Sequence, residues 1–197
     1  KCNNNPISKP SPTHPTPPSP PPPPTMSNKP RVFIALYARP NAPSLSSTRS
    51  KNPPSTYRWG IWIEPKGSAG DGISYDALSS LAFATPDNAA GWHLSIAPHS
   101  AFPADMLGRI MVGKLPEGVA PEDVGALLSH LPLPGEGGLE GEVEWVRVVL
   151  GKLQRNGCAE VFSVEQFVGD AVAYADGWVA KGKRKEKVNY TWSRTFP

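Results

Sequence analysis

The sequence predicts an α+β fold: an antiparallel sheet of about five strands packed by about three C-terminal helices. Short runs rich in β-branched and aromatic residues, separated by Pro- and Gly-rich turns, fill residues 31–115. From residue 121 onward the apolar residues instead recur at helical spacing. Because the strands all precede the helices and do not alternate with them, the pattern favours an antiparallel sheet with helices on one face.

The strands are predicted by five apolar runs, 31–38, 57–64, 73–78, 92–97 and 106–115. Prolines end the first two runs, and a Gly-rich turn joins the second and third into a hairpin. On the second strand, alternation places Tyr57 and Trp59 on one face and Arg58 on the other. The fifth run either alternates throughout or shifts its register at Gly108.

Three helices are predicted in the second half of the chain. The first, at 121–131, opens with a proline, which suits the first helical position, and carries an apolar stripe at i, i+3, i+4 and i+7. The second, at 143–153, shows the same spacing. The third follows Ser163, which forms a capping-box pattern with Gln166, and ends near Gly182.

Residues 1–30 are predicted to be a disordered Pro-rich tail, and residues 31–180 a single α+β domain. The tail holds 12 of the 25 prolines and almost no apolar residue that can pack in a core. Burial therefore cannot offset the entropy lost on ordering it. The first methionine is Met26, and we interpret the residues before it as a leader or linker. The alternative is a polyproline ligand for a module with an aromatic groove.

The formal net charge of +3 arises from the two ends of the chain. Residues 31–180 hold 16 acidic and 11 basic residues, so the domain itself is mildly acidic. This balance argues against nucleic acid as a partner. Residues 181–197 are predicted to be a basic C-terminal tail. Its cluster of Lys and Arg is either a nuclear-import or polyanion patch or the solvated end of a helix, where cations complement the helix dipole.

Membrane, disulfide-scaffold and metal-binding classes are not expected. No apolar run is long enough to cross a membrane, so we expect no membrane partner. Two cysteines, Cys2 and Cys158, do not make a disulfide framework, and we expect an intracellular location, cytoplasmic or nuclear. Because His93, His99 and His130 fit no metal-ligand spacing, we predict no metal and no cofactor.

Three stretches of the chain carry a resemblance to a known family. They are residues 31–39, 57–66 and 106–114, with the Trp-Val pair at 145–146. In order and spacing they resemble a family of uncharacterised fungal intracellular proteins, over about residues 31–180. Members usually read Tyr-His-Trp-Ala on the second strand, and Asn-Cys, two further residues and Trp-Val on the second helix. The resemblance implies no established activity.

The chain departs from this pattern at two positions that could carry chemistry. It reads Tyr-Arg-Trp-Gly from residue 57 and Gly-Glu-Val-Glu-Trp-Val from residue 141, so Arg58 replaces the His and Glu142 replaces the Cys. A strand His that precedes a helix Cys is similar to the order in circularly permuted papain-like hydrolases and acyltransferases, where the His activates the thiol. Arg is no base at neutral pH. The resemblance therefore implies a degenerate papain-like site.

If the two replacements face each other, Arg58 and Glu142 form an ion pair of about 3 to 4 Å. The alternative is that both are simply exposed. Since Trp59 and Trp62 lie on opposite faces of one strand, we expect one in the core and the other lining a groove or an oligomer contact. No catalytic residue is predicted; the candidate ligand-binding residues are Tyr57, Arg58, Trp59, Glu142 and Trp145.

We therefore expect a non-catalytic binding or interaction domain, a pseudoenzyme whose partner is an unknown protein or small-molecule ligand and whose oligomeric state stays open. The alternative is a cysteine-dependent hydrolase or acyltransferase that uses Cys158 with His93 or His99. A lone cysteine between two helices is otherwise a small residue that fills a loop. A third hypothesis is an adaptor in which the proline run recruits the partner.

Overall fold

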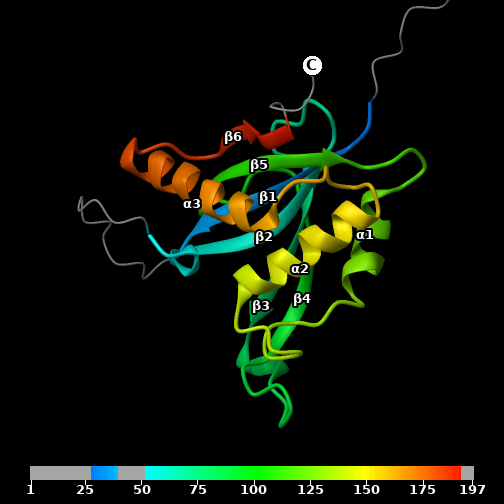
Figure 1. The fold of residues 1–197 in the computed structure, drawn as a ribbon, viewed down its shortest axis with the longest axis vertical. Helices are drawn as coiled ribbons and strands as arrows, with labels where there is room; N and C mark the ends of the chain where they lie inside the picture. The colour runs from blue at the N-terminus through cyan, green and yellow to red at the C-terminus, as the bar shows by residue number, and fades with distance from the viewer. Residues whose placement is uncertain (1–27, 40–51, 192–197) are drawn as a thin grey trace, which may run out of the picture.

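The computed structural model describes residues 28–39 and 52–191. One six-stranded sheet, in the order β4-β3-β2-β1-β5-β6, carries the α-helices on one face (Figure 1). This arrangement confirms the predicted α+β class. The strands are β1 Arg31–Ala38, β2 Tyr57–Glu64, β3 Gly72–Ser79, β4 Trp92–His99, β5 Met106–Lys114 and β6 Glu186–Asn189. The α-helices are α1 Pro121–Leu128, α2 Glu142–Arg155 and α3 Val164–Ala180.

The five predicted strands and three predicted helices all form, in the predicted order. Strands β1 to β5 pair antiparallel, and the β1–β2 register runs without a break from Arg31 opposite Glu64 to Ala38 opposite Tyr57. The Ser163 side chain accepts a hydrogen bond from the Gln166 N–H and so caps α3 as predicted. The end of α1 at Leu128 is earlier than its apolar stripe suggests.

The sheet continues into the segment that was predicted to be a basic C-terminal tail. Strand β6 pairs parallel with β5, with Gly108 opposite Glu186 and Met111 opposite Asn189. The apolar pattern missed this strand because it is four residues long and only Val188 is apolar. The folded domain therefore extends beyond residue 180. Residues 1–27, most of the predicted Pro-rich tail, lie outside the described residues.

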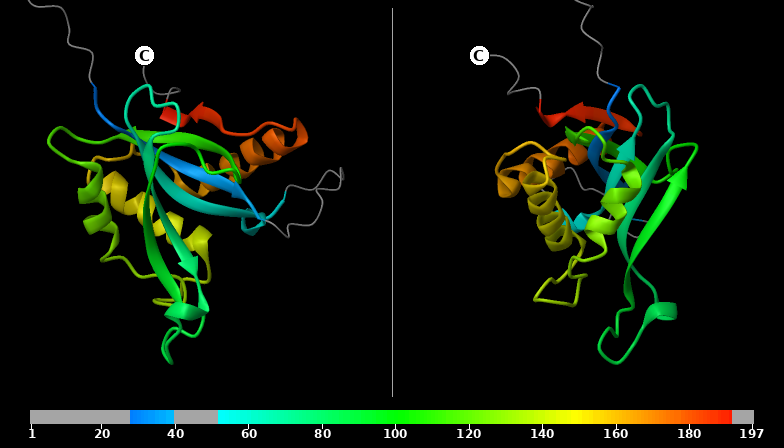
Figure 2. Two further views of the ribbon diagram at one scale, coloured as in Figure 1. Left: turned by 180° about the vertical axis from the view of Figure 1, so that it is seen from behind. Right: turned by 90° about the vertical axis from the view of Figure 1, so that its right-hand side faces the viewer.

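The main hydrophobic core lies between the sheet and the helices. In the right-hand view of Figure 2, α2 and α3 lie to one side of the sheet; α2 packs mainly on β2 and α3 on β5. The alternate side chains of the central strands face this core, as the period of two requires. Fully buried members include Ile34, Leu36, Trp59, Ile61, Trp145, Val149, Leu153, Phe167 and Ala175.

The opposite face of the sheet buries a second, smaller cluster under charged side chains. This cluster consists of Phe33, Ala35, Tyr37, Trp62, Met106 and Met111. Glu64 is fully buried there. Its Oε2 lies 2.8 Å from the Arg109 Nε, and its Oε1 lies 2.8 Å from the Lys187 Nζ. Trp62 and Trp59 are therefore both in the interior, one on each face. The prediction that one of them lines a groove or an oligomer contact was wrong.

A β-bulge in β5 sets which of its side chains face the helices. The pairing of β1 with β5 skips Leu107, which makes it the extra residue. The register shift at Gly108, one of the two predicted alternatives, is therefore observed. A Cβ at Gly108 would lie 2.6 Å from the Trp178 ring, so glycine allows α3 to approach β5 closely.

Strands β2 and β3 pair over only part of their length, so the first residues of β2 have no β3 partner. Their register runs from Ile61 opposite Tyr75 to Ile63 opposite Ile73. Beyond Tyr75, β3 continues with β4 as far as Ser79, and the β3–β4 hairpin extends past the N-terminal end of α2 (Figure 1). The first residues of β2 therefore have an open backbone edge on their β3 side.

Candidate functional site

Glu142, the first residue of α2, lies at the open edge of β2. Its side chain is only 7% exposed, and its Oε2 atom accepts a hydrogen bond of 3.0 Å from the backbone N–H of Trp59. The Arg39 guanidinium lies 3.1 Å from the same oxygen. Burial raises the pKa of the Glu142 carboxyl above its ordinary value, against the opposing effects of these two donors. The carboxylate therefore supplies the acceptor that a strand partner would supply elsewhere in the sheet.

Arg39 joins three segments of the chain at this point. Its Nε donates to the Ser55 carbonyl oxygen at 3.1 Å, while an Nη contacts Glu142. Arg39 directly follows β1, and Ser55 lies in the 3-10 turn η1, Pro54–Thr56. Because Arg39 is exposed, the ion pair itself contributes only about 0 to 1 kcal/mol. Its main effect is to fix where the end of β1 lies relative to α2.

A groove of about 680 Å³ opens beside Glu142. It lies between the first turn of α2, the turn η1, the end of β3 and the start of β4. It therefore brings together charged side chains from segments that are far apart in the sequence. Besides Glu142, its lining includes Arg39, Trp92, Glu140, Glu144 and Arg147.

Arg58 lies on the face of β2 that is opposite Trp59, and two carboxylates hold it. Its guanidinium is 3.0 Å from Asp76 on β3 and 3.0 Å from Asp105, just before β5. The guanidinium carbon also lies 3.8 Å above the centre of the Tyr37 ring. Burial raises the pKa of Asp76, and the neighbouring Arg58 charge opposes that effect. Arg58 is thus fixed in position by charge on two sides.

Gly60 makes room for the Asp76 carboxylate on this face. A Cβ at Gly60 would collide with the carboxylate oxygen that Arg58 contacts. The Arg58–Asp76 pair and the glycine two residues after Arg58 therefore belong to one arrangement.

The predicted ion pair between Arg58 and Glu142 was wrong, and so was the alternative that both are exposed. Glu142 reaches the backbone of Trp59, whereas the side chain of Arg58 leaves the strand on the opposite face. Arg58 pairs instead with Asp76 and Asp105. Its charge still lowers the pKa of Glu142. The two groups therefore interact electrostatically without a direct bond.

The other three predicted site residues are buried and connect elements of the fold. The Tyr57 hydroxyl donates to the Asp176 carboxylate on α3. The Trp59 indole N–H donates to the Pro54 carbonyl oxygen at 2.8 Å, and Trp145 is fully buried. Of the five predicted residues, the groove lining includes only Glu142. The remaining three influence the groove only by fixing the positions of η1, β2 and α2.

No histidine within residues 28–39 and 52–191 is in contact with Cys158. The thiol is buried, its contact is the Asn156 carbonyl oxygen at 3.7 Å, and burial raises its pKa. His93 stacks on Phe83 at the β3–β4 hairpin, and His99 contacts Ser74 at 3.1 Å. A nucleophilic cysteine needs a lowered pKa and a base, so these contacts contradict an enzyme built on Cys158 with His93 or His99. Its surroundings are those of a small residue that packs in a loop.

Sequence reasoning missed the partners of the two replaced residues. The motifs that carry the resemblance do not include Asp76 or Asp105, and Arg39 is only the last residue of the first motif. Trp92 was interpreted only as the start of a strand. Alternation gave no signal for Asp76, because it shares its face of β3 with Ser74, whereas Tyr75 and Ala77 face the main core. A buried carboxylate in a strand indicates a cationic partner nearby.

The described residues form neither a metal cluster nor a membrane-spanning helix. Among them, no group of three or more His, Cys, Asp or Glu side chains could hold a metal ion. None of the helices in residues 28–39 and 52–191 has the length and apolar character needed to cross a bilayer.

Residues 29–194 match the model of DUF6914, a family of unknown function, and the chain belongs to this family. The chain matches no curated protein and no solved structure. The predicted membership of an uncharacterised family is thereby confirmed, whereas the fungal origin and the papain-like similarity stay predictions. Family membership names no activity, so the functional conclusion depends on the geometry of the groove.

Proposed function

We propose that this protein is a non-catalytic ligand-binding domain with the layout of a degenerate papain-like site. The ligand, a small molecule or a segment of a protein, binds in the groove at the N-terminus of α2. The observation that carries the proposal is Glu142: a buried carboxylate at the start of a helix, bonded to the open edge of the neighbouring strand. That is the place where a thiol nucleophile would have to lie.

Glu142 lies at the positive end of the α2 dipole, a position that would stabilise a thiolate. The N-terminus of a helix carries partial positive charge and lowers the pKa of a thiol placed there. Gly141, the N-cap residue, offers no side-chain acceptor of its own. Glu142 uses this place for a carboxylate that is already bonded to Trp59 and Arg39. Both donors contact the same oxygen, Oε2, and a carboxylate is a much poorer nucleophile toward an acyl carbon than a thiolate.

Arg58 lies beside a carboxylate, which is the neighbour that a catalytic imidazole needs. Asp76 on the adjacent strand contacts the side chain at residue 58, as an orienting carboxylate contacts a catalytic histidine. A guanidinium keeps its proton at every physiological pH, so Arg58 cannot act as the base. The glycine at 60, where the family usually has alanine, fits the same change because Asp76 needs that space. Both chemical positions are therefore filled by groups that suit binding and not thiol chemistry.

The groove itself supports a binding role. At about 680 Å³ it has the size typical of small-ligand sites, which range over about 300 to 1,000 Å³. An aromatic side chain, Trp92, and several charged groups converge on it. The charged groups can fix the orientation of a ligand, and the apolar side chains can contact its hydrocarbon part.

The proposal is tested with the uniformly ¹⁵N-labelled full chain and a fragment set that contains anionic, neutral and cationic compounds. We expect backbone amide shifts to concentrate at groove residues, among them Ser79, Trp92 and Val143. The same protein is assayed for turnover of p-nitrophenyl acetate and of a thioester, with and without iodoacetamide.

Two results would overturn the proposal. Turnover that iodoacetamide abolishes would show that thiol chemistry is present. A fragment set that leaves every groove amide unshifted, while other surfaces respond, would remove the binding role. A matched Trp92→Ala variant identifies the groove, because shifts that survive this change unaltered come from elsewhere.

A further inference from the structure

We propose that the ligand of this groove presents a guanidinium or primary ammonium group on a short apolar stem. The inference rests on the proposed function and specifies the chemistry that the same groove recognises. Three features carry it: the charge that is left unpaired in the groove, the guanidinium that the protein itself places there, and the apolar wall.

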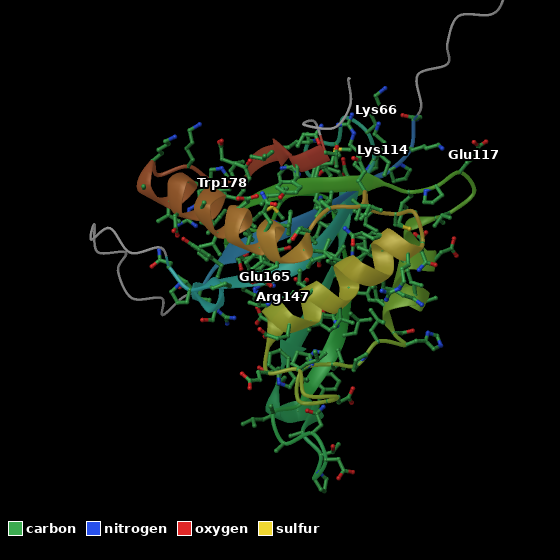
Figure 3. All side chains as sticks on the ribbon, in the orientation of Figure 1. Lys66, Lys114, Glu117, Arg147, Glu165 and Trp178 are labelled. Carbon is green, nitrogen blue, oxygen red and sulfur yellow. The ribbon has the colours of Figure 1, made fainter. Side chains whose placement is uncertain are left out.

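The cations that line the groove are paired, whereas two of its carboxylates are not. Arg39 contacts Glu142 at 3.1 Å, and Arg147 contacts Glu165 at 3.1 Å, as Figure 3 shows for the second pair. Glu140 and Glu144 have no ion-pair partner among the residues that the structure describes. Counted over the described residues, the lining therefore carries unbalanced negative charge and favours a cationic ligand.

Arg39 shows that a guanidinium fits the groove. Its planar group lies between the buried carboxylate of Glu142 and the Ser55 carbonyl oxygen, with contacts of 3.1 Å to each. Both acceptors are fixed, since Glu142 is also bonded to Trp59 and Ser55 belongs to η1. A guanidinium in a ligand can contact two further carboxylates of the lining, those of Glu140 and Glu144.

The wall of the groove suits an aliphatic stem and the face of a cation. Trp92 lines it, and both its backbone N–H and its carbonyl are held by the Asn88 side chain, at 2.9 and 2.8 Å. An aromatic ring held in this way can contact a methylene stem or a cation over its face. Pro54 and Val143 add apolar surface on the facing sides.

Anions and metal ions fit the groove less well than an organic cation. The start of α2 attracts anions in general, but here its first turn already holds Glu142 and Glu144. A divalent cation needs several carboxylates in one cluster, and the described residues contain no such group of three. An ammonium or guanidinium group needs only one or two carboxylates and tolerates their separation.

The test is isothermal titration calorimetry on the full chain with four probes. Agmatine represents a free amine, acetyl-arginine amide and a tri-arginine peptide represent peptide side chains, and acetyl-citrulline amide is the neutral match. The variants Glu140→Gln and Glu144→Gln remove one carboxylate charge each. The control is Glu117→Gln, an exposed glutamate on the loop between β5 and α1 and away from the groove (Figure 3).

We expect each groove variant to weaken the cationic probes about fivefold, equivalent to about 1 kcal/mol, and Glu117→Gln to leave them unchanged. Acetyl-citrulline amide should bind at least about fivefold more weakly than acetyl-arginine amide, and added salt should reduce the difference. Tighter binding of agmatine than of the peptides points to a free amine, and the reverse points to a peptide side chain. Either order supports the inference.

Equal binding of the citrulline and arginine probes would overturn it, as would equal effects of the groove variants and Glu117→Gln. Binding of anionic or neutral fragments in the groove, with no binding of the cations, would also overturn it while the proposed binding function stands. If no probe and no fragment binds in the groove, the proposed function fails as well. The two failures are thus distinguishable.

Discussion

Replacement of Glu142 separates its role as a hydrogen-bond acceptor from its role as a charge. In Glu142→Ala the Trp59 N–H loses its acceptor in a buried place, which costs about 1 to 3 kcal/mol. With a central value of about 2 kcal/mol, a domain of this size loses about 4 to 8 °C in Tm. Glu142→Gln keeps an amide oxygen in the same position, so its stability at neutral pH should equal or exceed that of the wild type.

The pH dependence of that difference follows from the raised pKa of Glu142. Because the folded-state pKa lies above the ordinary value of 4.5, the folded state binds a proton at this site more readily than the unfolded chain. The group's contribution to stability is therefore fully present below the unfolded pKa and is lost as pH rises through the folded pKa. The Gln variant lacks this titration, so its stability relative to the wild type should increase from about pH 4 to pH 7.

The assay is urea unfolding followed by tryptophan fluorescence, at pH 4, 5.5 and 7, for both variants and for Glu117→Gln as an exposed control. Equal stability of Glu142→Ala and Glu142→Gln would show that the carboxylate is not needed as an acceptor for β2. A relative stability of Glu142→Gln that decreases as pH rises would refute the desolvation of the carboxyl group.

Three further predictions concern the start of α2, the opposite face and the thiol. Glu142→Cys should react with iodoacetamide at pH 6 at least about tenfold faster than Cys158 by peptide mapping, because a helix N-terminus lowers a thiol pKa; equal rates would show that the start of α2 does not activate a thiol. Glu64→Gln should cost about 3 to 5 kcal/mol in urea unfolding, since it leaves the buried Arg109 charge uncompensated; a loss below about 1 kcal/mol would mean that water reaches Arg109. In a Cys2→Ser variant, Cys158 should react with Ellman's reagent slowly at pH 7 and rapidly in urea, because burial raises its pKa; fast native labelling would mean that the loop opens.

The sequence determined the sheet and helices well where local pattern and packing agree. Strands β1 and β2 are apolar runs that end at prolines, and α2 and α3 carry apolar stripes at helical spacing. Strand β6 could not be found in this way. Its only apolar side chain is Val188, and its place depends on a parallel pairing with residues 108–111 that are distant in sequence.

The candidate site was predicted in part, for a reason that the strand geometry explains. Alternation already placed Arg58 and Trp59 on opposite faces of β2, but the pattern does not show which face α2 covers. Once Glu142 bonds to the Trp59 backbone, Arg58 needs other partners, and Asp76 and Asp105 supply them. These contacts depend on long-range pairing of β2, β3 and β5, which spacing within a motif cannot reveal.

The way the fold protects its strand edges decides between two modes of recognition. A peptide that binds by adding a strand needs a row of free backbone N–H and C=O groups. At the open edge of β2, Glu142 already accepts from the Trp59 N–H.

The outer edge of β4 is blocked in a similar manner. Asn88 bonds both backbone groups of Trp92, and Pro98 has no N–H to offer. Strand addition over the start of β2 or the start of β4 would first have to displace these groups, so the protein's own side chains oppose it there. Recognition by the side chains that line the groove needs no such displacement. A backbone-only ligand such as oligoglycine should therefore leave the amide signals of both edges unshifted, whereas a ligand with a cationic side chain should shift those around Glu140 and Glu144.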